Sequence, residues 1–134
     1  MILVDTSVLV DWFRRRNNPK AEAFAKILDD KTTFAISILT YQELLRGVKN
    51  EAEYALLKNY LEAQNIIYLP NTLEFYRMPV NIYRYIRTQG ETVRSSIDLL
   101  IASTAIYHEA QLLHNDKDFD VIANFFPSRL MIYR

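Results

Sequence analysis

Four acidic residues lie at the edges of apolar stretches, in places where an α/β fold would bring them together. They come from four separate segments of the chain and are Asp5, Glu43, Asp98 and Asp116. Asp5 ends the strand-like run Ile2–Val4, and Asp116 follows a second such run, Leu112–Asn115. In an open parallel sheet, ligands bind in the crevice beyond the carboxyl ends of the strands. We therefore expect the four carboxylates to meet in one pocket.

Carboxylates gathered in one pocket repel one another, by about 1 kcal/mol per pair at 4 Å in water and about 4 kcal/mol at an effective dielectric constant of 20. Such a cluster needs a cation, and a site made only of oxygen ligands favours Mg²⁺ or Mn²⁺. The pattern therefore predicts a metal-dependent nuclease. Asp5, Asp98 and Asp116 are the preferred metal ligands, and Glu43 is either a further ligand or the residue that orients the attacking water.

Each acid also has a structural explanation. Asp5 is a favoured N-cap for the helix that follows, and Thr40-Tyr41-Gln42-Glu43 matches a capping box. Asp98 lies in the first turn of a helix, where it would interact favourably with the helix dipole, and Asp116 suits a turn. However, Asp98 directly precedes the apolar run Leu99–Ala102, beside which an isolated carboxylate would be costly to bury without partners. The combination of four acids is more specific than any one of them.

Short apolar strands alternate with helical patterns along the chain. We expect strands at Ile2–Asp5, Thr33–Ser37, Ile66–Leu69, Gln111–His114 and Leu130–Tyr133. We expect helices at Ser7–Arg16, from Pro19 with Asn18 as its cap, and at Thr40–Asn50, Glu51–Gln64, Asn71–Gln89, Ser96–Ala110 and Asp118–Phe126, with a kink or interruption at Pro79. This alternation predicts a parallel sheet with right-handed crossovers and helices on both faces. The predicted fold is α/β, a single α/β/α sandwich domain spanning residues 1–134 around a five-stranded parallel sheet.

The composition limits the class of protein. A chain of 134 residues fits one domain, and its 50% hydrophobic and 13% aromatic content can form a core. Because there is no cysteine, disulfides and cysteine zinc sites are excluded. Met1 runs directly into the first strand pattern without a signal-peptide pattern, and no stretch approaches the roughly 20 apolar residues of a membrane span. We expect a cytoplasmic protein with no membrane partner.

The net charge is zero, from 16 basic and 16 acidic residues, and does not by itself indicate nucleic-acid binding. Arginines gather locally in Arg14–Arg16 and in the segment between Arg77 and Arg94. These clusters are either solvated helix faces or a phosphate-contacting rim around an acidic centre. The aromatic, arginine-bearing stretch Phe75–Tyr85 is either ordinary helix packing or an interface, since Tyr and Arg are common interface anchors.

Four segments resemble the four motifs of PIN-domain ribonucleases. They are Val4–Ser7, Ser37–Gly47, Ser96–Ala102 and Asn115–Phe119, and they follow the family's order at plausible spacing. Within that superfamily the chain most resembles VapC-type toxins of bacterial and archaeal toxin–antitoxin pairs, from the first strand to the last. The resemblance implies an Mg²⁺- or Mn²⁺-dependent endoribonuclease, a homodimer and neutralisation by a small antitoxin. It also implies structured RNA substrates, transfer RNA among them.

The resemblance assigns roles residue by residue. The family's acidic positions are matched by Asp5, Glu43, Asp98 and Asp116. Thr6 or Ser7 matches the polar position beside the first acid, and Asn115 and Asp118 are candidate supporting residues in the fourth motif, although Asp118 also suits a helix cap. His114 stands where the family usually carries Thr or Ser, which puts the contribution of that hydroxyl in doubt. We expect His114 to be satisfied locally at the strand end; the alternative is substrate contact or proton transfer.

Other folds with acids at strand ends fit less well. A receiver domain needs an aspartate after its third strand and a lysine near its fifth, but the third strand here is followed by Pro70-Asn71. A haloacid-dehalogenase-type phosphatase needs Asp-x-Asp, which Asp5-Thr6-Ser7 does not provide. Nucleotide-binding turns need several glycines, and the chain has only Gly47 and Gly90. Two alternative functions on the same fold remain. One is a non-catalytic PIN-like RNA- or protein-binding module. The other is a DNA-processing nuclease, although a chain of 134 residues leaves little room for the insertions that guide DNA.

Overall fold

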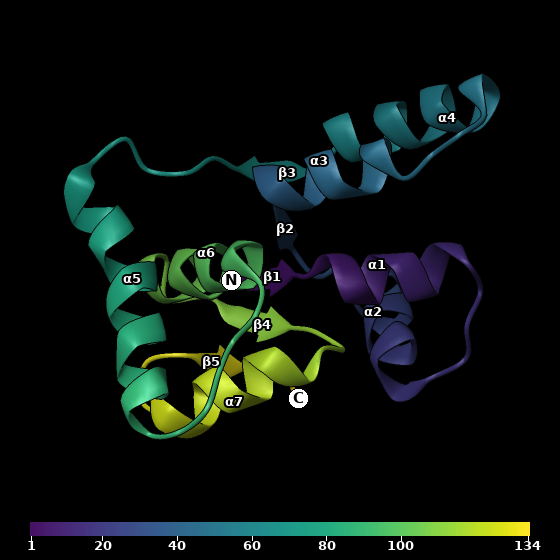
Figure 1. Cartoon of the computed structure of the whole chain (residues 1–134). Helices are drawn as coiled ribbons and strands as arrows, with labels where there is room; N and C mark the ends of the chain where they lie inside the picture. Colours follow the sequence, from purple (N-terminus) through teal and green to yellow (C-terminus); the bar gives the residue numbers. More distant parts are fainter.

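The computed structural model describes residues 1–134 as strands and helices in alternation around one sheet (Figure 1). The strands are β1 (Ile2–Val4), β2 (Phe34–Ser37), β3 (Asn65–Ile67), β4 (Gln111–Leu113) and β5 (Met131–Ile132). The helices are α1 (Thr6–Phe13), α2 (Pro19–Asp29), α3 (Ile38–Arg46), α4 (Glu51–Glu62), α5 (Leu73–Thr88), α6 (Ser96–Tyr107) and α7 (Lys117–Phe125). The strand order is β3-β2-β1-β4-β5 and every neighbouring pair is parallel. The predicted five-stranded parallel sheet is confirmed.

Alternate residues of the central strands face two different layers of helices, as the pleat of a strand requires. Leu3 and Leu112 belong to a buried apolar cluster with residues of α5, α6 and α7. Val4 and Leu113 belong to a second cluster with residues of α1, α2, α3 and α4. Helices therefore cover both faces of the sheet, which confirms the α/β/α arrangement. None of these helices has both the length and the apolarity to cross a membrane.

The register of the sheet brings the carboxyl ends of three strands to one edge. Val4 of β1 pairs with Leu113 of β4, so Asp5 and His114 leave the sheet side by side. The Asp5 backbone N–H also donates to the Leu113 carbonyl oxygen at 2.9 Å. On the other side of β1, strand β2 ends at Ser37, which caps α3. The edge from which α1, α3 and α7 begin is therefore the edge that carries the acidic motifs.

Helix α5 continues through Pro79, so of the predicted kink or interruption the interruption is wrong. Proline lacks the backbone donor that an interior helical position normally uses. In α5, however, Pro79 lies in a buried stripe with Phe75, Ile82 and Ile86. The two isoleucines belong to the core that α5 shares with α6. Burial of this apolar stripe offsets the missing hydrogen bond. The helix ends only at Thr88, shortly before Gly90, whose φ is +84°.

Helix α6 ends at Tyr107, three residues before the predicted Ala110. Glu109 has a left-handed φ of 52°, and the Ala110 N–H bonds to the Ala105 carbonyl oxygen at 2.8 Å, which closes the helix. Helix α3 begins at Ile38 instead of Thr40, because Ser37 is its N-cap. Strand β3 is also displaced, to Asn65–Ile67 in place of Ile66–Leu69. The remaining elements agree with prediction to within about three residues.

Candidate active site

Asp5 joins the end of β1 to the start of α1. It is the N-cap of α1, and its Oδ2 accepts hydrogen bonds from the Ser7 backbone N–H at 3.0 Å and the Ser7 hydroxyl at 2.6 Å. The capping interpretation of Asp5 is therefore confirmed. The side chain is almost completely buried. Burial, partly opposed by the bonds from Ser7 and Thr6, raises the pKa of Asp5 to about 6. Asp5 is thus a capping residue and also a carboxylate, at the edge of the sheet, whose charged form is disfavoured by burial.

Glu43 does not act as a capping-box residue, because helix α3 begins before the predicted box. The Ser37 hydroxyl accepts from the Leu39 N–H at 3.1 Å, and Thr40 is buried inside the helix. Glu43 Oε1 instead lies 3.0 Å from the Thr6 hydroxyl, which donates to it. The Thr6 hydroxyl also lies 3.1 Å from the Thr40 hydroxyl. Through Thr6, the first-motif segment therefore holds the carboxylate of the second motif in place.

Asp98, Asp116 and Asp118 form the tightest acidic group. One carboxylate oxygen from each lies within 4.8 Å of the other two, and all three side chains are half-buried. Asp98 lies in the first turn of α6, where its N–H is capped by the Ser95 hydroxyl at 3.2 Å. Asp116 is the N-cap of α7, and its Oδ1 accepts from the Asp118 N–H at 2.9 Å. Three oxygens at this spacing match the hard donors that a divalent cation requires.

Asp98 experiences the field of all the other acids of the site. Burial first, and then the charges of Asp5, Asp116, Asp118 and Glu43, raise its pKa to about 7. Asp5, Glu43 and Asp116, the other three predicted acids, are thus all near enough to Asp98 for their charges to raise its pKa. Asp118, which the sequence marked only as a supporting residue, joins them. A carboxyl group surrounded by like charges favours its protonated form unless a cation is present.

The raised pKa values predict that the stability of the metal-free protein falls as the pH rises. The folded-state pKa values are about 6 for Asp5 and about 7 for Asp98, against 3.8 for the free side chain. The folded protein therefore retains protons that the unfolded chain releases. Their stabilising contribution is fully present below about pH 4 and is lost as the pH rises through 6 and 7. Urea unfolding in EDTA across this range measures the effect.

The Asp98→Asn variant isolates this contribution. Between about pH 4 and pH 7.5, the free energy of unfolding should fall in both the wild-type protein and the variant. Because Asp98 is only half-buried, we expect the fall to be smaller in the variant by about 1 to 2 kcal/mol. Asp29→Asn, at the exposed end of α2, is the matched control and should follow the wild-type curve. Parallel curves for Asp98→Asn and the wild-type protein would contradict the assignment.

His114 is buried at the end of β4, and the prediction that it is satisfied locally holds for Nδ1 but not for Nε2. Its Nδ1 accepts a hydrogen bond from the Asp116 backbone N–H at 3.2 Å. Its Nε2 lies 3.4 Å from Asp120 Oδ1 and makes no hydrogen bond. Burial lowers the pKa of His114, against the raising influence of Asp120. The imidazole thus orients the backbone of the fourth motif through Nδ1.

Sequence reasoning missed Asp11, a buried carboxylate in α1. Its Oδ2 accepts from the side-chain amide of Asn115 at 2.9 Å, so Asn115 reaches Asp11 with the side chain that was predicted to support the site. The Asn115 backbone N–H donates to the Ser7 hydroxyl at 2.9 Å. The signal that could have revealed Asp11 is the one used for Asp98, an acid set within the apolar run Val8–Phe13.

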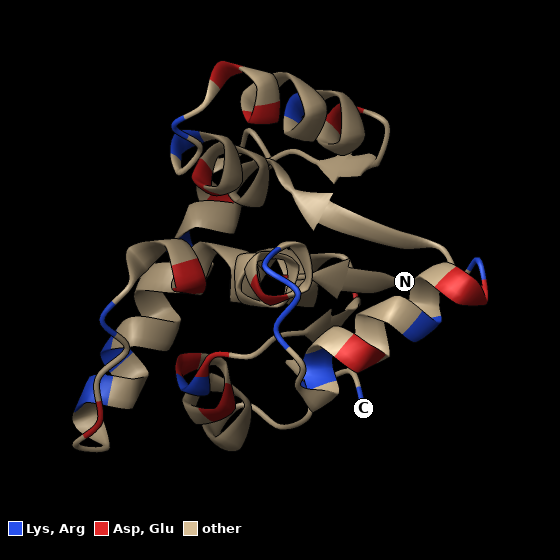
Figure 2. Cartoon of the chain, turned by 90° about the vertical axis from the view of Figure 1, so that its right-hand side faces the viewer, with Lys and Arg blue, Asp and Glu red and all other residues tan.

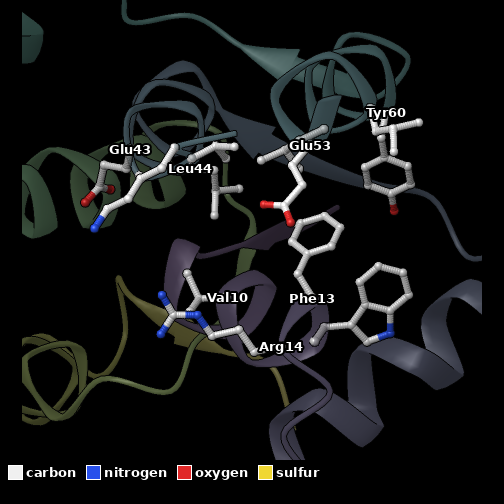
Figure 3. A pocket seen from close by; sticks show the side chains of 13 residues that line it. Val10, Phe13, Arg14, Glu43, Leu44, Glu53 and Tyr60 are labelled. Atoms are coloured by element: carbon white, nitrogen blue, oxygen red, sulfur yellow. The ribbon is translucent and has the colours of Figure 1, made fainter. Parts of the chain in front are cut away.

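An apolar groove runs beside the acidic cluster, between α1 on one side and α3 and α4 on the other (Figure 3). Its volume is about 1020 Å³. The apolar residues that line it are Val10, Trp12, Phe13, Leu44, Val48, Leu56, Leu57 and Tyr60. Glu43 lies at one end of the groove and Tyr60 at the other, with Arg14 and Glu53 along its sides (Figure 3). Because Glu43 lines both, the groove opens onto the acidic site.

The arginine clusters have mixed roles. Arg16 donates to Asp11 at 3.0 Å, and Arg87 donates to the Glu91 carbonyl oxygen and the Thr92 hydroxyl. Arg14 lines the apolar groove. Figure 2 shows basic and acidic residues interspersed over that side of the molecule. Part of the predicted basic rim is therefore engaged in local hydrogen bonds.

A parallel α/β sandwich with acids at the carboxyl edge of its sheet defines a class of protein. The family model for the PIN domain matches residues 2–124, and the chain belongs to the PIN-domain family. Ribonuclease VapC11 of Mycobacterium tuberculosis strain H37Rv is 36% identical over 124 residues, which make up 92% of this chain and 92% of that protein. Within the family, the chain therefore stands with the VapC proteins.

Solved structures support the same placement. VapBC-1 from nontypeable Haemophilus influenzae is 26% identical, with a TM-score of 0.72 over 99% of this chain and 97% of that chain. A toxin–antitoxin complex from Klebsiella pneumoniae is 25% identical, with a TM-score of 0.66 over 89% of this chain and 90% of that chain. The similarity thus extends over most of the fold and includes the edge of the sheet that carries the acids.

Proposed function

We propose that the protein is a divalent-metal-dependent endoribonuclease and the toxin of a toxin–antitoxin pair. The observation that carries the proposal is the acidic site, in which Asp98, Asp116 and Asp118 lie within reach of one cation and Asp5 and Glu43 lie close by. The relationship to Ribonuclease VapC11 supports RNA as the substrate, and transfer RNA is the type we favour. The proposal treats residues 1–134 as one domain and places its action in the cytoplasm, where such RNA is found.

The donor set fits Mg²⁺ or Mn²⁺, because it consists of carboxylate oxygens without a sulfur or nitrogen ligand. We assign cation binding to Asp98, Asp116 and Asp118, with Asp5 as a further ligand. When bound, the cation would activate water for attack and neutralise the negative charge that develops at the phosphate. Asp98 supports this assignment, since burial and the neighbouring charges raise its pKa, and a nearby cation would relieve both effects.

The other polar residues position this site. Ser7 holds the Asp5 carboxylate through two hydrogen bonds. Thr6 holds Glu43 beside the pocket, where we propose that the Glu43 carboxylate orients the attacking water. His114 fixes the backbone of Asp116 through Nδ1. The carboxylates of Asp5, Glu43 and Asp116 are thus restrained by hydrogen bonds within the chain, which contributes to the preorganisation that phosphodiester hydrolysis needs.

The experiment that tests the nuclease is end-mapping of RNA after exposure to the wild-type protein and to the Asp98→Asn variant, each with Mn²⁺ or with EDTA. New 5′ ends should appear only with the wild-type protein and the cation. Identical maps for the two proteins would reject the nuclease. The surviving candidate would then be a non-catalytic binding module, which the complete set of acids disfavours.

A small antitoxin is the partner that we assign to the apolar groove. The groove presents a wide apolar surface and also contains Glu43 and Glu53. Leu56 is 73% exposed there, and a helical or extended segment with large apolar side chains would cover it. A basic side chain at the end of such a segment would reach Glu43 and oppose cation binding at the site. The Klebsiella pneumoniae toxin–antitoxin complex supports a partner of this kind.

We further propose a homodimer through the exposed side of α5. Phe75 is buried, whereas Tyr85 is 47% exposed although its ring lies 5.4 Å from that of Phe126. Tyr83 is 38% exposed and, with Arg84 and Arg87, lines a hollow of about 460 Å³. Light scattering at about 10 µM should show a dimer for the wild-type protein and a monomer for Tyr83→Glu. Tyr54→Glu on α4 is the matched control and should stay dimeric, whereas a monomeric wild-type protein would reject the proposal.

A further inference from the structure

Asp11 is a buried carboxylate outside the acidic cluster, and three side chains converge on it, two from the connection between α1 and α2 and one from the loop after β4. It is 7% exposed. Its Oδ1 accepts from Arg16 Nη1 at 3.0 Å, and its Oδ2 accepts from the amides of Asn18 at 3.0 Å and Asn115 at 2.9 Å. Burying a charge in this way is costly unless its partners satisfy it. The arrangement therefore calls for an explanation beyond helix formation, to which Asp contributes poorly.

Two of the three partners have structural roles near α1. Arg16 lies just after α1 and keeps a largely exposed side chain. Asn18 is the N-cap of α2, and its Oδ1 accepts from the N–H groups of Lys20 and Ala21. Asn115 is different, because it directly precedes Asp116 and belongs to the loop that carries the fourth motif. Asp11 therefore joins the end of α1 to the acidic site.

Asn115 is held to α1 at two points, although the residue is exposed. Its side-chain amide donates to Asp11, and its backbone N–H donates to the Ser7 hydroxyl at 2.9 Å. That hydroxyl in turn donates to Asp5 Oδ2. An unbroken series of hydrogen bonds thus runs from Asp5 through Ser7 and Asn115 to Asp11.

We infer that Asp11 is a positioning residue that holds the Asn115–Asp118 loop against electrostatic repulsion. Asp116 and Asp118 lie within 4.8 Å of Asp98, and like charges at such separations push apart. The loop carries two of these three charges, so it would move outward if it were not anchored. The anchor provided by Asp11 keeps the carboxylates close enough to share one cation. This inference rests on the proposed function only in that the cluster binds a divalent cation.

Mn²⁺ titration followed by electron paramagnetic resonance tests the inference without RNA. Asp11→Ala and Asn115→Ala should each weaken Mn²⁺ binding by about 10-fold, the loss typical of residues that orient metal ligands. The double variant should be about as weak as either single variant, because both remove the same bond. Arg16→Ala removes another partner of Asp11 but spares Asn115, so it should bind Mn²⁺ within about 2-fold of the wild-type protein.

Hydrogen exchange of the metal-free proteins supplies a second readout. Amides of residues 114–118 should exchange faster in Asp11→Ala and Asn115→Ala than in Arg16→Ala, since only the first two release the loop. Asn115→Ala changes an exposed side chain and keeps the test valid if Asp11→Ala fails to fold. Unchanged Mn²⁺ affinity in Asn115→Ala, additive losses in the double variant, or an equal loss in Arg16→Ala would each overturn the inference.

The outcome also separates this inference from the proposed nuclease. If the variants weaken Mn²⁺ binding as expected and the wild-type protein cuts no RNA, the nuclease proposal fails and the positioning role stands. If the wild-type protein cuts RNA and the variants bind Mn²⁺ as it does, the positioning role alone fails. In cleavage assays, added Mn²⁺ should restore the rate of Asn115→Ala, since the ligands themselves are intact.

Discussion

Replacing Asp98 by asparagine is expected to reduce RNA cleavage by about 10³-fold or more while the protein stays folded. Asp98 is the acid whose pKa responds to all the other carboxylates of the site, and its oxygen lies within 4.8 Å of those of Asp116 and Asp118. Loss of a direct cation ligand should exceed the 10- to 100-fold loss typical of residues that only orient ligands. Initial rates on a defined RNA at saturating Mn²⁺ measure the effect.

The stability of the same variant distinguishes a functional carboxylate from a structural one. In EDTA at about pH 7.5, Asp98→Asn should unfold with a free energy about 1 to 2 kcal/mol higher than that of the wild-type protein, because one member of a repelling cluster is gone. Asp29→Asn should change neither the rate nor the stability. A variant that cuts RNA at more than about a tenth of the wild-type rate, or that loses stability, would refute the assignment.

Asp98 is a cleaner test than Asp5. Asp5 caps α1 and accepts two hydrogen bonds from Ser7. Removing such a cap costs about 1 kcal/mol, which would partly hide the relief of repulsion. The Asp98 side chain makes no hydrogen bond that the substitution would break, since its helix is capped by Ser95. A loss of cleavage in Asp98→Asn therefore reports on the carboxylate and not on the helix.

Replacing Leu56 by glutamate is expected to abolish neutralisation by the antitoxin while leaving cleavage intact. Leu56 is 73% exposed on α4 and lines the apolar groove. A charge there would be buried without a partner when the antitoxin docks. If Leu56 is a hot spot, the complex should weaken by about 30-fold or more. Growth on co-expression with a candidate antitoxin, and the affinity of the purified pair, measure the loss.

Leu73→Glu is the matched control for the groove. Leu73 is 70% exposed at the start of α5 and does not line the groove. The same chemical change there should leave neutralisation as it is in the wild-type protein. Both variants should cut RNA at the wild-type rate, and this result would show that the substitutions leave the protein folded. Equal neutralisation of Leu56→Glu and Leu73→Glu would remove the groove as the docking site.

The sequence by itself determined the architecture and the position of most of the acids. Short apolar strands alternating with helices permit little except a parallel sheet covered on both faces. An acid that directly follows a strand, such as Asp5 after Val4, must then lie at the carboxyl edge of that sheet. The local chemistry also determined several caps, such as Asn18 before α2, because a cap depends on residues a few positions apart.

Only the tertiary structure decided how the acids are held. Glu43 matched a capping box in sequence, yet its partner is Thr6, which lies far away along the chain. Pro79 carries a local signal to break a helix, which the burial of its stripe overrides. Asp118 joined the acidic group because the turn at Asp116 aims both side chains at Asp98. In each case the deciding contact is long-range or depends on burial, and the spacing of residues along the chain predicts neither long-range contacts nor burial.

Asp11 shows most clearly the difference between what the sequence determines and what the tertiary structure determines. The sequence places an acid on an apolar helix, a pattern that indicates some buried partner but does not say which one. The partner Asn115 becomes a neighbour because β1 and β4 pair in parallel, so that α1 and the fourth-motif loop leave the sheet together. Sequence periodicity determines which residues a strand or helix buries. The pairing of strands distant in sequence determines which buried polar groups meet, and this physical reason left Asp11 to the tertiary structure.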